Sequence, residues 1–373
     1  MNKYCIRCIM NSDVDSSIFF DEQGLCNHCS RYDQLKSSRL FAKNGAEIAL
    51  NKIVLKIKKA GLGKNYDCIV GVSGGVDSSY VVYLVKSLGL RPLAVHLDNG
   101  WNSELAVKNI ENILKKLDVD LVTIVLDWNE FRDLQLSFLK ASTPDGEIPT
   151  DHAIFAALWR EAARRKIKYI ISGMNFATES ISVSNWSYGH SDWRYIKGVH
   201  KIFGKKDLKT YPHFSFLYLI YINLIKGIRT VSILNYFNYN KEQVMSILQK
   251  DLNWIYYGGK HYESIYTRFY QGFLLPKKFG IDKRYAHLSD LINSGQISKD
   301  AALAELDKDN YPIQQKDDDM FFVMKKLELS QDEFLKIMKQ PKKNFSDYPN
   351  SSKFLFLLKF VVNKLRFYGV YPK

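Results

Sequence analysis

Cysteines offer the first chemistry in this sequence. Two pairs have C-x-x-C spacing, Cys5 with Cys8 and Cys26 with Cys29. The separation between the pairs falls within the range typical of four-cysteine zinc sites. Two such knuckles complete a tetrahedral sulfur shell with no open position, which predicts a structural metal site. Zinc is the expected ion, and an iron–sulfur cluster or a pair of disulfides are the alternatives.

A second chemical motif is the string SGGVDSS, which follows the apolar run 67–72 and precedes the apolar segment 80–88. A strand, a glycine-rich turn and a helix N-terminus form an anion site, because the backbone amides approach a phosphate and the helix dipole favours its charge. The string is neither a Walker loop nor G-x-G-x-x-G. We expect Asp77 to help hold Mg²⁺. The residues expected to bind the phosphates are Ser73, Gly74, Gly75, Val76, Asp77, Ser78 and Ser79.

Strands and helices alternate around this loop. Strands are predicted at 67–72, 93–98, 121–126 and 169–171, with helical segments between them. This alternation predicts an α/β fold with a doubly wound parallel sheet, in which ligands bind beyond the carboxyl ends of the strands. Asp98 and Gly173 lie at such ends and are candidate nucleotide contacts. The fifth cysteine, Cys68, lies in the first strand and is expected to be a buried core thiol.

Three regions are predicted along the chain of 373 residues. Residues 1–40 form the four-cysteine knuckle, residues 41–205 the nucleotide-binding α/β domain, and residues 206–373 a mostly helical substrate- and partner-binding region. Within the second region, 184–205 is predicted to be a loop beside the pocket. The net charge of +14 indicates an acidic partner: a nucleotide, a phosphosugar, nucleic acid or an anionic membrane. A hydrophobic fraction of 46% excludes disorder as the main state.

Membrane-spanning segments are not predicted, because no uninterrupted apolar run reaches about 18 residues. The N-terminus has no apolar signal region, and a cytoplasmic protein is expected. The longest apolar stretches are 214–225 and 354–362. A peripheral association with a membrane surface is the alternative role of these stretches.

The second half of the chain contains an aromatic and charged run, WIYYGGKHYESIYTRFYQ, over residues 254–271. Two glycines predict a turn, and a helix is predicted to begin near Lys260. Helical spacing would then place Lys260, Glu263 and Thr267 on one face, with Arg268 one position further round. Such a face suits an anionic pocket, although a salt-bridged surface helix has the same pattern.

These motifs resemble those of a large enzyme superfamily and of one narrower family within it. SGGVDSS resembles the PP-loop of ATP pyrophosphatases, the superfamily of GMP, asparagine and NAD synthetases and of tRNA-thiolating enzymes. The C-x-x-C pairs, the 254–271 run, TPDGEIPTDH at 143–152 and IDKRYAHLS at 281–289 extend the resemblance. Together they resemble the N-acetyl sugar amidotransferases of bacterial surface-polysaccharide synthesis, of the WbpG/PseA/LfnA type. The resemblance spans about residues 3–306 and implies the PP-loop, adenine nucleotide alpha hydrolase-like fold.

This resemblance implies an ATP-dependent enzyme that converts the acetamido group of a nucleotide-activated sugar to an acetamidino group. The amide oxygen would attack ATP to give an O-adenylyl imidate and pyrophosphate, and ammonia would then displace AMP. The implied pathway is that of lipopolysaccharide O-antigen, capsule or flagellin glycan. The implied cofactors are ATP, Mg²⁺ and Zn²⁺, and no nucleic acid partner is expected.

Glutamine hydrolysis needs a nucleophilic cysteine. The paired cysteines are expected to bind metal and Cys68 to be buried, so ammonia should come from other proteins. The resemblance implies a HisH-like glutaminase and a HisF-like, cyclase-like companion, as in imidazole-glycerol-phosphate synthase.

Roles for individual residues follow from this hypothesis. Lys260 and Arg268 would stabilise charge on the transferring phosphoryl group. His261 or Glu263 would accept a proton from the attacking ammonia. Glu179 lies in a stretch that resembles the D-x-x-E-S motif of GMP synthetase-like enzymes and is a candidate Mg²⁺ ligand.

In this stretch Phe176 replaces the first acid of the D-x-x-E-S motif. Candidates for contact with the sugar are Asp151, His152 and Arg194. An alternative role for Asp151 is to cap the N-terminus of the predicted helix over 152–165.

Two other functions remain open from the sequence. A PP-loop tRNA-thiolating enzyme would also be basic and ATP-dependent, but it needs a thiol, persulfide or cluster beside the loop. A non-catalytic scaffold would use the knuckle and the basic tail 353–373 to dock an assembly at a membrane.

Overall fold

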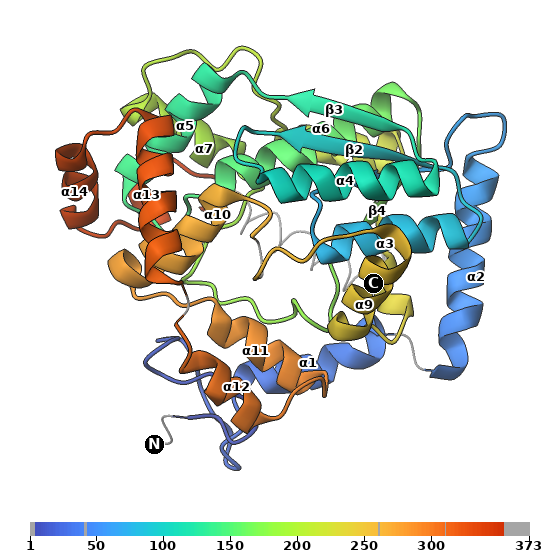
Figure 1. The fold of residues 1–373 in the computed structure, drawn as a ribbon, viewed down its shortest axis with the longest axis horizontal. Coiled ribbons are helices and arrows are strands. Elements are labelled where there is room, and N and C mark those ends of the chain that lie inside the picture. The colour runs from blue at the N-terminus through green and yellow to red at the C-terminus, as the bar shows by residue number, and fades with distance from the viewer. Residues whose placement is uncertain (1–3, 41–42, 260–261, 310, 354–373) are drawn as a thin grey trace.

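The computed structural model describes residues 4–40, 43–259, 262–309 and 311–353. Its centre is an all-parallel sheet of five strands in the order β3-β2-β1-β4-β5 (Figure 1). In register, Ile69 of the central strand pairs with Leu93 on one side and with Ile170 on the other. The doubly wound parallel sheet predicted from the sequence is confirmed. The strands are β1 (Cys68–Gly71), β2 (Pro92–Asp98), β3 (Leu121–Val125), β4 (Tyr169–Ser172) and β5 (Arg229–Ser232).

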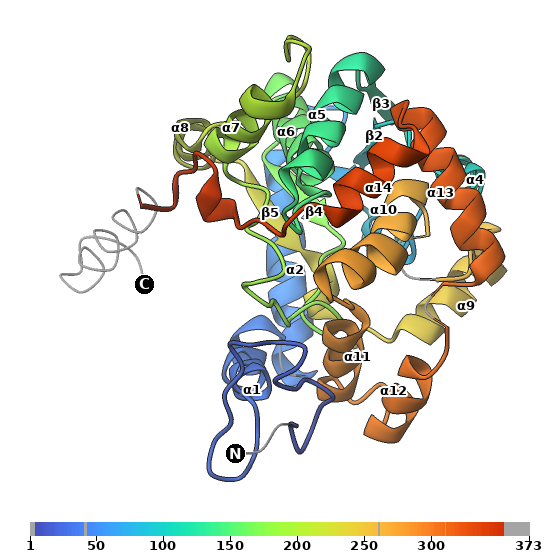
Figure 2. The same ribbon diagram turned by 90° about the vertical axis from the view of Figure 1, so that its left-hand side faces the viewer.

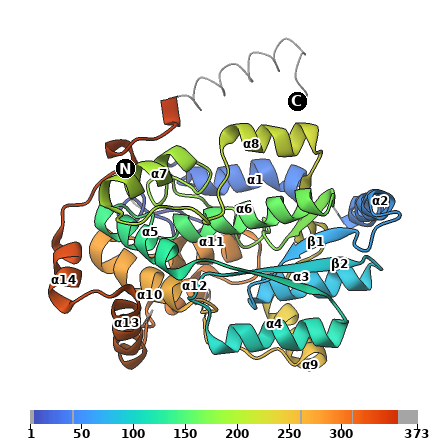
Figure 3. The same cartoon turned by 90° about the horizontal axis from the view of Figure 1, so that it is seen from above.

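Both faces of the sheet are covered by helices, as Figure 3 shows from above. Cys68 and Val70 point into an apolar cluster that four helices complete, whereas Ile69 points into a cluster on the opposite face. Burial on both faces explains why β1 reads as a continuous apolar run. The first face carries α2 (Lys43–Ala60), α3 (Val76–Ser87), α4 (Glu104–Leu117) and α9 (Lys241–Leu252), and the second carries α6 (Ile148–Arg164), α8 (Phe216–Ile220) and η1 (Tyr221–Ile225).

Cys68 is fully buried within the first cluster, as predicted. Burial raises the pKa of its thiol well above the usual range, because a thiolate would lose its hydration there. The side chain therefore remains a neutral part of the core.

Two elements differ from the sequence-based predictions. β5 lies within the region expected to be helical, so the sheet extends past residue 205. Its first two residues, Arg229 and Thr230, are exposed at the sheet edge, and this edge position explains the missing apolar run. The predicted loop over 184–205 contains a helix, α7 (Trp193–Phe203), whose N-terminus is capped by the Asp192 carboxylate.

The remaining helices form a group beside the sheet (Figure 2). α5 packs against α7, α10 packs against α13, and α11 packs against α12. The segment 354–373, which includes the apolar stretch 354–362, lies outside the described residues. The bounds are α5 (Trp128–Ala141), η2 (Ile233–Tyr236), α10 (Ile265–Phe269), η3 (Tyr270–Phe279), α11 (Arg284–Asn293), α12 (Lys299–Leu306), α13 (Ile313–Leu327), α14 (Gln331–Lys339) and η4 (Phe345–Asp347).

The four paired cysteines gather at the N-terminal end of α1 (Asn27–Arg39). Their sulfur atoms all lie within 4.8 Å of one another and are buried. The Cys5–Cys29 and Cys8–Cys26 sulfurs are 3.9 and 3.7 Å apart. Those separations exceed a disulfide bond and match the edge of a tetrahedron with metal–sulfur bonds of about 2.3 Å. The donor set and its size therefore fit a zinc ion.

The cysteine cluster is attached to α11 and α12, which lie beside α1 in Figures 1 and 2. The Cys29 sulfur lies 3.3 Å from Asn293 Oδ1 of α11. The Lys299 ammonium of α12 donates to the Cys5 carbonyl at 2.7 Å. The N-terminal segment is thus joined to helices almost 300 residues away along the chain.

We expect the purified protein to contain about one zinc ion per chain, measured by inductively coupled plasma mass spectrometry. Cys8→Ser should remove most of this metal and lower the melting temperature by roughly 5 °C or more, because metal binding contributes directly to folding. Cys68→Ala is the matched control, since it deletes a buried thiol outside the cluster and should leave the metal content unchanged. Equal metal content in both variants would contradict the assignment.

Candidate functional site

A polar pocket opens at the carboxyl ends of β1 and β4, where the chain leaves the two central strands toward opposite faces of the sheet. This is the place where an open parallel sheet binds its ligand. Five parts of the chain form its wall. The lining residues are Ser73, Gly75, Val76, Asp77, Ser78, Gly173, Met174, Thr178, Glu179, Lys241, Tyr256, Tyr257, Gly259, Glu263 and His287.

The SGGVDSS string forms the tight turn between β1 and α3. Gly74 has a positive φ of 79°, and a Cβ at this position would lie 2.3 Å from the Ala106 carbonyl oxygen. Glycine is therefore required both by the backbone conformation and by the close approach of α4. Gly75 caps α3, so the first amides of that helix face the pocket. Ser78 Oγ accepts from the Ser73 amide at 3.2 Å and holds the turn closed.

The 254–264 segment, about 180 residues later in the chain, packs against this turn. The Trp254 indole N–H donates to the Gly74 carbonyl at 2.9 Å, and the ring is buried. A Cβ on Gly75 would lie 3.3 Å from both the Tyr257 hydroxyl and the Glu263 carboxylate. Burial, followed by the Glu263 charge, raises the pKa of Tyr257. The phenol is therefore neutral and keeps its proton for donation.

The start of α10 is anchored to the loop that follows β2. The Ser103 amide donates to the Glu263 carbonyl at 2.9 Å, and the Ile265 amide donates to the Trp101 carbonyl at 2.9 Å. Ser264 caps α10 through the Thr267 amide. The helix therefore begins at Ile265 rather than near residue 260, and Glu263 is held on a turn, not on the predicted helical face.

Both candidate magnesium ligands line the pocket. Asp77, in the first turn of α3, accepts a hydrogen bond from the Tyr239 hydroxyl. Burial and the Asp77 charge raise the pKa of Tyr239, which stays a donor. Glu179 is exposed on the segment after β4. Carboxylate oxygens from two segments are the donor chemistry that Mg²⁺ prefers, so these residues fit the ion.

Phe176, which replaces an acid in this motif, stacks on Tyr32 of α1 with ring centroids 4.8 Å apart. The position thus joins the pocket loop to the cysteine-bearing segment by an apolar contact. A carboxylate there would be buried against a phenol ring.

Two predicted residues have other partners. Arg268 makes a two-point ion pair with Asp319 of α13, at 2.6 and 2.7 Å, and its guanidinium lies 5.1 Å from the Tyr262 ring centroid. The geometry therefore gives Arg268 a positioning role and corrects the predicted phosphoryl contact. Asp98 accepts from the Gly100 amide at 2.8 Å and shapes the loop after β2. Lys260 and His261 lie outside the described residues, so their roles remain predictions.

His152 is fully buried, and both of its ring nitrogens have partners. Nδ1 lies 2.6 Å from the His190 carbonyl, and Nε2 accepts from the Phe214 amide at 3.2 Å. The imidazole is therefore neutral, and burial lowers its pKa to about 3. This arrangement leaves no nitrogen for a sugar and corrects the predicted contact. Asp151 and Arg194 are exposed in the first turns of α6 and α7, away from the pocket lining.

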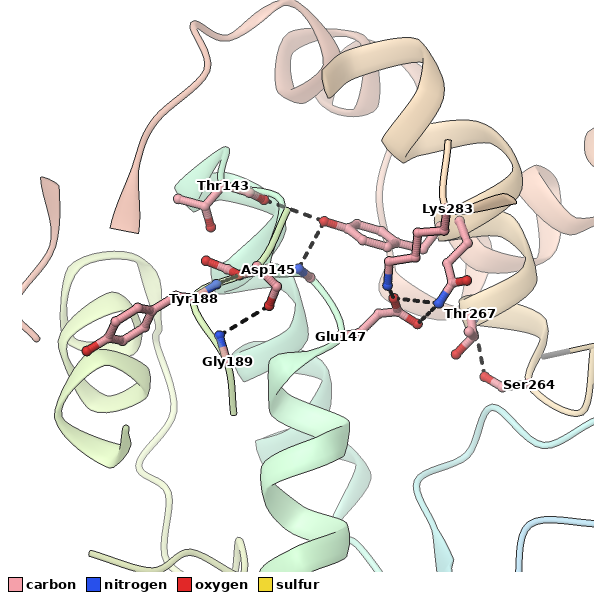
Figure 4. Close-up of polar contacts among 12 residues, drawn as sticks. Thr143, Asp145, Glu147, Tyr188, Gly189, Ser264, Thr267 and Lys283 are labelled. Atoms are coloured by element: carbon pink, nitrogen blue, oxygen red, sulfur yellow. Dashed lines mark hydrogen bonds and ion pairs between the residues drawn. The ribbon is translucent and has the colours of Figure 1, made fainter. Parts of the chain in front are cut away.

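The TPDGEIPTDH run around His152 joins α6 to the C-terminal helices (Figure 4). Glu147 accepts from Lys283 Nζ at 2.9 Å and from Gln271 Nε2 at 2.8 Å. The Gly146 amide donates a hydrogen bond to the Tyr270 hydroxyl. Only glycine fits at this position, because a Cβ would lie 2.4 Å from the Tyr270 ring. Residues 143–150 therefore serve mainly to connect α6 to η3 and to Lys283, and they do not form an open binding surface.

Several pocket residues were not singled out by sequence reasoning. Tyr256 and Tyr257 lie in the recognised 254–271 run, and His287 lies in IDKRYAHLS, so motif membership could have indicated all three. Thr178 lies in the stretch that resembles the D-x-x-E-S motif, whereas Lys241 lines the pocket without any motif signal. Their positions depend on the docking of α9 and on the turn after β4.

Comparisons with known proteins bear on the C-terminal part of this site. Residues 263–364 match the model of the family described as "LPS biosynthesis protein WbpG-like, C-terminal domain". This part of the chain is similar to that domain and is called the WbpG-like domain below. The resemblance to WbpG-type proteins predicted from the motifs is thereby confirmed. The WbpG-like domain begins at Glu263, which is itself part of the pocket wall, and it also contributes His287.

Relatives extend the similarity beyond the WbpG-like domain. The chain is 26% identical over 320 residues to an uncharacterized protein of Methanocaldococcus jannaschii, covering 83% of this chain and 94% of that protein. It is 32% identical over 117 residues to the glutamine-hydrolyzing GMP synthase of Pyrobaculum aerophilum, covering 30% of this chain and 22% of that enzyme. It is 36% identical over 70 residues to the tRNA(Ile)-lysidine synthase of Chlamydia pneumoniae, covering 18% of this chain and 22% of that enzyme.

Among solved structures, the NH3-dependent NAD synthetase from Campylobacter jejuni aligns with 55% of this chain and 84% of that chain. The identity is 15% and the TM-score is 0.29, which is a weak structural likeness.

The Trp254 contact generates a prediction. Trp254→Phe keeps a ring but removes the donor to the Gly74 carbonyl, and we expect about tenfold weaker ATP binding by isothermal titration calorimetry. Trp186→Phe is the matched control, because the Trp186 indole also donates to a backbone carbonyl, that of Val14 at 3.3 Å, outside the pocket. If both variants weakened ATP binding equally, the effect would be general destabilisation and the predicted role of the Trp254 contact would be wrong.

The buried His152 generates a prediction about pH. Its folded pKa lies below the unfolded value of about 6.5, so the unfolded chain binds a proton that the folded chain excludes. Stability is therefore lost as the pH falls from about 6.5 toward 3. Between pH 7 and pH 5 we expect this residue to account for about 2 kcal/mol of lost unfolding free energy, measured by urea denaturation. His152→Gln should reduce that loss, and an equal loss in both proteins would contradict the assignment.

Proposed function

We propose that the chain is an ATP-dependent N-acetyl sugar amidotransferase, which converts an acetamido group of a nucleotide-activated sugar to an acetamidino group. The proposal places it in the synthesis of a bacterial surface glycan. One observation carries it: the WbpG-like domain begins inside the nucleotide pocket, at Glu263, two residues from the N-terminus of α10. The family-specific part of the chain and the phosphate-binding turn thus meet around one ligand space.

The chemistry of the pocket supports adenylation. ATP and Mg²⁺ are the substrate and ion that the PP-loop implies, and the ion would neutralise charge on the phosphates. The α3 amides and the hydroxyls of Ser73 and Ser78 would hold the leaving pyrophosphate. Asp77 and Glu179 would hold the ion. Lys241 lines the same wall and would add positive charge beside the phosphates.

The reaction balances in two steps. The acetamido oxygen bonds to the α-phosphorus of ATP and pyrophosphate leaves, which gives an O-adenylyl imidate. Ammonia then attacks the imidate carbon, the carbon–oxygen bond breaks, AMP leaves, and a proton passes from nitrogen to a base. Glu263 lies in the pocket and is our choice for this base, with His261 as the alternative. Tyr256 and Tyr257 would screen the activated imidate from water.

The supply of ammonia is assigned to separate proteins. A HisH-like glutaminase and a HisF-like companion would deliver it, because we assign no glutaminase nucleophile to this chain. Zinc in the four-cysteine site would have a structural role, since four thiolates occupy every position of a tetrahedral ion.

A second candidate is a PP-loop enzyme that acts on tRNA. The local similarity to tRNA(Ile)-lysidine synthase and the net charge of +14 favour it. The thiolating version needs a reactive sulfur beside the loop, yet the Cys68 side chain is buried in β1 and its thiol is neutral. We prefer the sugar as substrate, and the WbpG-like domain supports this choice.

A mass-spectrometric assay tests the proposal. The purified chain would be incubated with ATP, Mg²⁺, ammonium chloride and a panel of nucleotide-linked diacetamido sugars. We expect a product about one mass unit lighter than its substrate, because NH replaces O, together with equal amounts of AMP and pyrophosphate. Glutamine should replace ammonium only after a glutaminase partner is added.

Controls separate the two candidates. Glu263→Gln should lower product formation by about a hundredfold or more while leaving ATP binding nearly unchanged, because it removes a base but preserves the side-chain shape. If every sugar kept its mass while tRNA stimulated pyrophosphate release, the tRNA function would replace the proposed one.

A further inference from the structure

The α8–η1 segment presents an apolar stripe to solvent. Leu217, Ile220, Tyr221, Leu224 and Ile225 are 74%, 40%, 40%, 66% and 74% exposed. Their spacing of three and four residues is the pattern by which a helix normally faces a protein core. Among the described elements, α8 lies on the side of α6 that faces away from the sheet (Figure 3).

The opposite side of the same segment is packed against the protein. Ile222 is fully buried with Ile228 in the cluster beneath the sheet, and Tyr218 packs against that cluster. Phe214, just before α8, lies 4.8 Å from the Trp159 ring of α6. The segment therefore has a docked inner face, and the exposure of its outer stripe is not a result of a detached helix.

Basic residues, called the basic rim below, flank both ends of the α8–η1 segment. Within 158–168 and 213–232 Glu161 is the single acidic residue, and its carboxylate is buried in ion pairs with Arg164 and Arg165. Two hydrogen bonds join these segments: Arg160 donates to the His213 carbonyl at 2.7 Å, and Lys168 donates to the Lys226 carbonyl. The rim consists of Arg160, Arg164, Arg165, Lys166, Lys168, Lys226 and Arg229.

Exposed leucine and isoleucine side chains beside cations are the combination of groups that an anionic lipid bilayer binds. An anionic lipid bilayer offers acyl chains to the stripe and phosphate headgroups to the rim. Tyr221 has the amphipathic character that favours the level of the headgroups, and Lys226 lies 5.4 Å over its ring. The phosphates of a nucleic acid would satisfy the rim, but a nucleic acid offers no acyl chains and would leave the aliphatic stripe in water.

We propose that the α8–η1 stripe and its basic rim form a surface that docks on an anionic membrane without crossing it. Among the residues that the structure describes, no helix is long and apolar enough to cross a membrane. The surface lies on the sheet face that carries α6, whereas the PP-loop pocket opens at the strand ends. This inference does not rest on the proposed function.

Flotation of the full chain with lipid vesicles tests the proposal. We expect the wild type to float with phosphatidylcholine vesicles that contain about 30% phosphatidylglycerol. With vesicles of pure phosphatidylcholine it should remain in the unbound bottom fraction. Binding should fall as the salt concentration rises from about 0.05 to 0.5 M. Ile225→Asp should reduce the bound fraction about tenfold.

Matched controls identify the surface. Ile48→Asp changes the same residue type at 72% exposure on α2, and it should bind vesicles like the wild type. The double variant Lys166→Gln/Arg229→Gln should weaken binding and its salt dependence, whereas Lys115→Gln/Lys116→Gln on α4 should not. Circular dichroism melting would show that each variant is folded.

The proposal is overturned if the wild type ignores anionic vesicles at low salt, or if Ile225→Asp and Ile48→Asp float equally. It is also overturned if tRNA binds the rim and excludes vesicles while Ile225→Asp keeps its full lipid binding.

Discussion

The burial of β1 on both faces is the constraint on which the rest of the molecule depends. Cys68 and Val70 belong to one apolar cluster and Ile69 to the other, so helices must cover both sides of the same strand. The chain meets this demand with α2, α3, α4 and α9 on one face and α6, α8 and η1 on the other, while β2 and β3 lie on one side of β1 and β4 and β5 on the other. The connections after β1 and β4 then diverge, and the pocket is the space that their divergence leaves.

The C-terminal half completes this space. Gly74 must bend with a positive φ and approach α4, and its carbonyl is then satisfied by an indole 180 positions away. Tyr257 and Glu263 approach the neighbouring Gly75 from the same segment. The shape of the SGGVDSS turn is thus a property of two distant parts of the chain.

Sequence reasoning succeeded where chemistry depends on local order. SGGVDSS after an apolar run predicted the turn, and the spacing of the cysteines predicted a cluster that the structure brings together. It failed where a side chain depends on a distant partner. Arg268 looked available for phosphate, but Asp319 lies 51 positions later and pairs with it. His152 looked polar and open, yet the His190 carbonyl and the Phe214 amide occupy both nitrogens. β5 was missed because an exposed edge strand needs no apolar run.

The attachment of the cysteine cluster to α11 and α12 has a consequence for how the protein is made. Synthesis runs from the N-terminus, so the cysteine segment leaves the ribosome long before its docking helices exist. Ile9, buried at 4% exposure against Leu288 and Ala302, has no apolar partner during that interval. Metal binding requires only the first 29 residues, so it can shape the segment before docking. An ion bound there would therefore order the segment before its docking helices, almost 300 residues later in the chain, have been made.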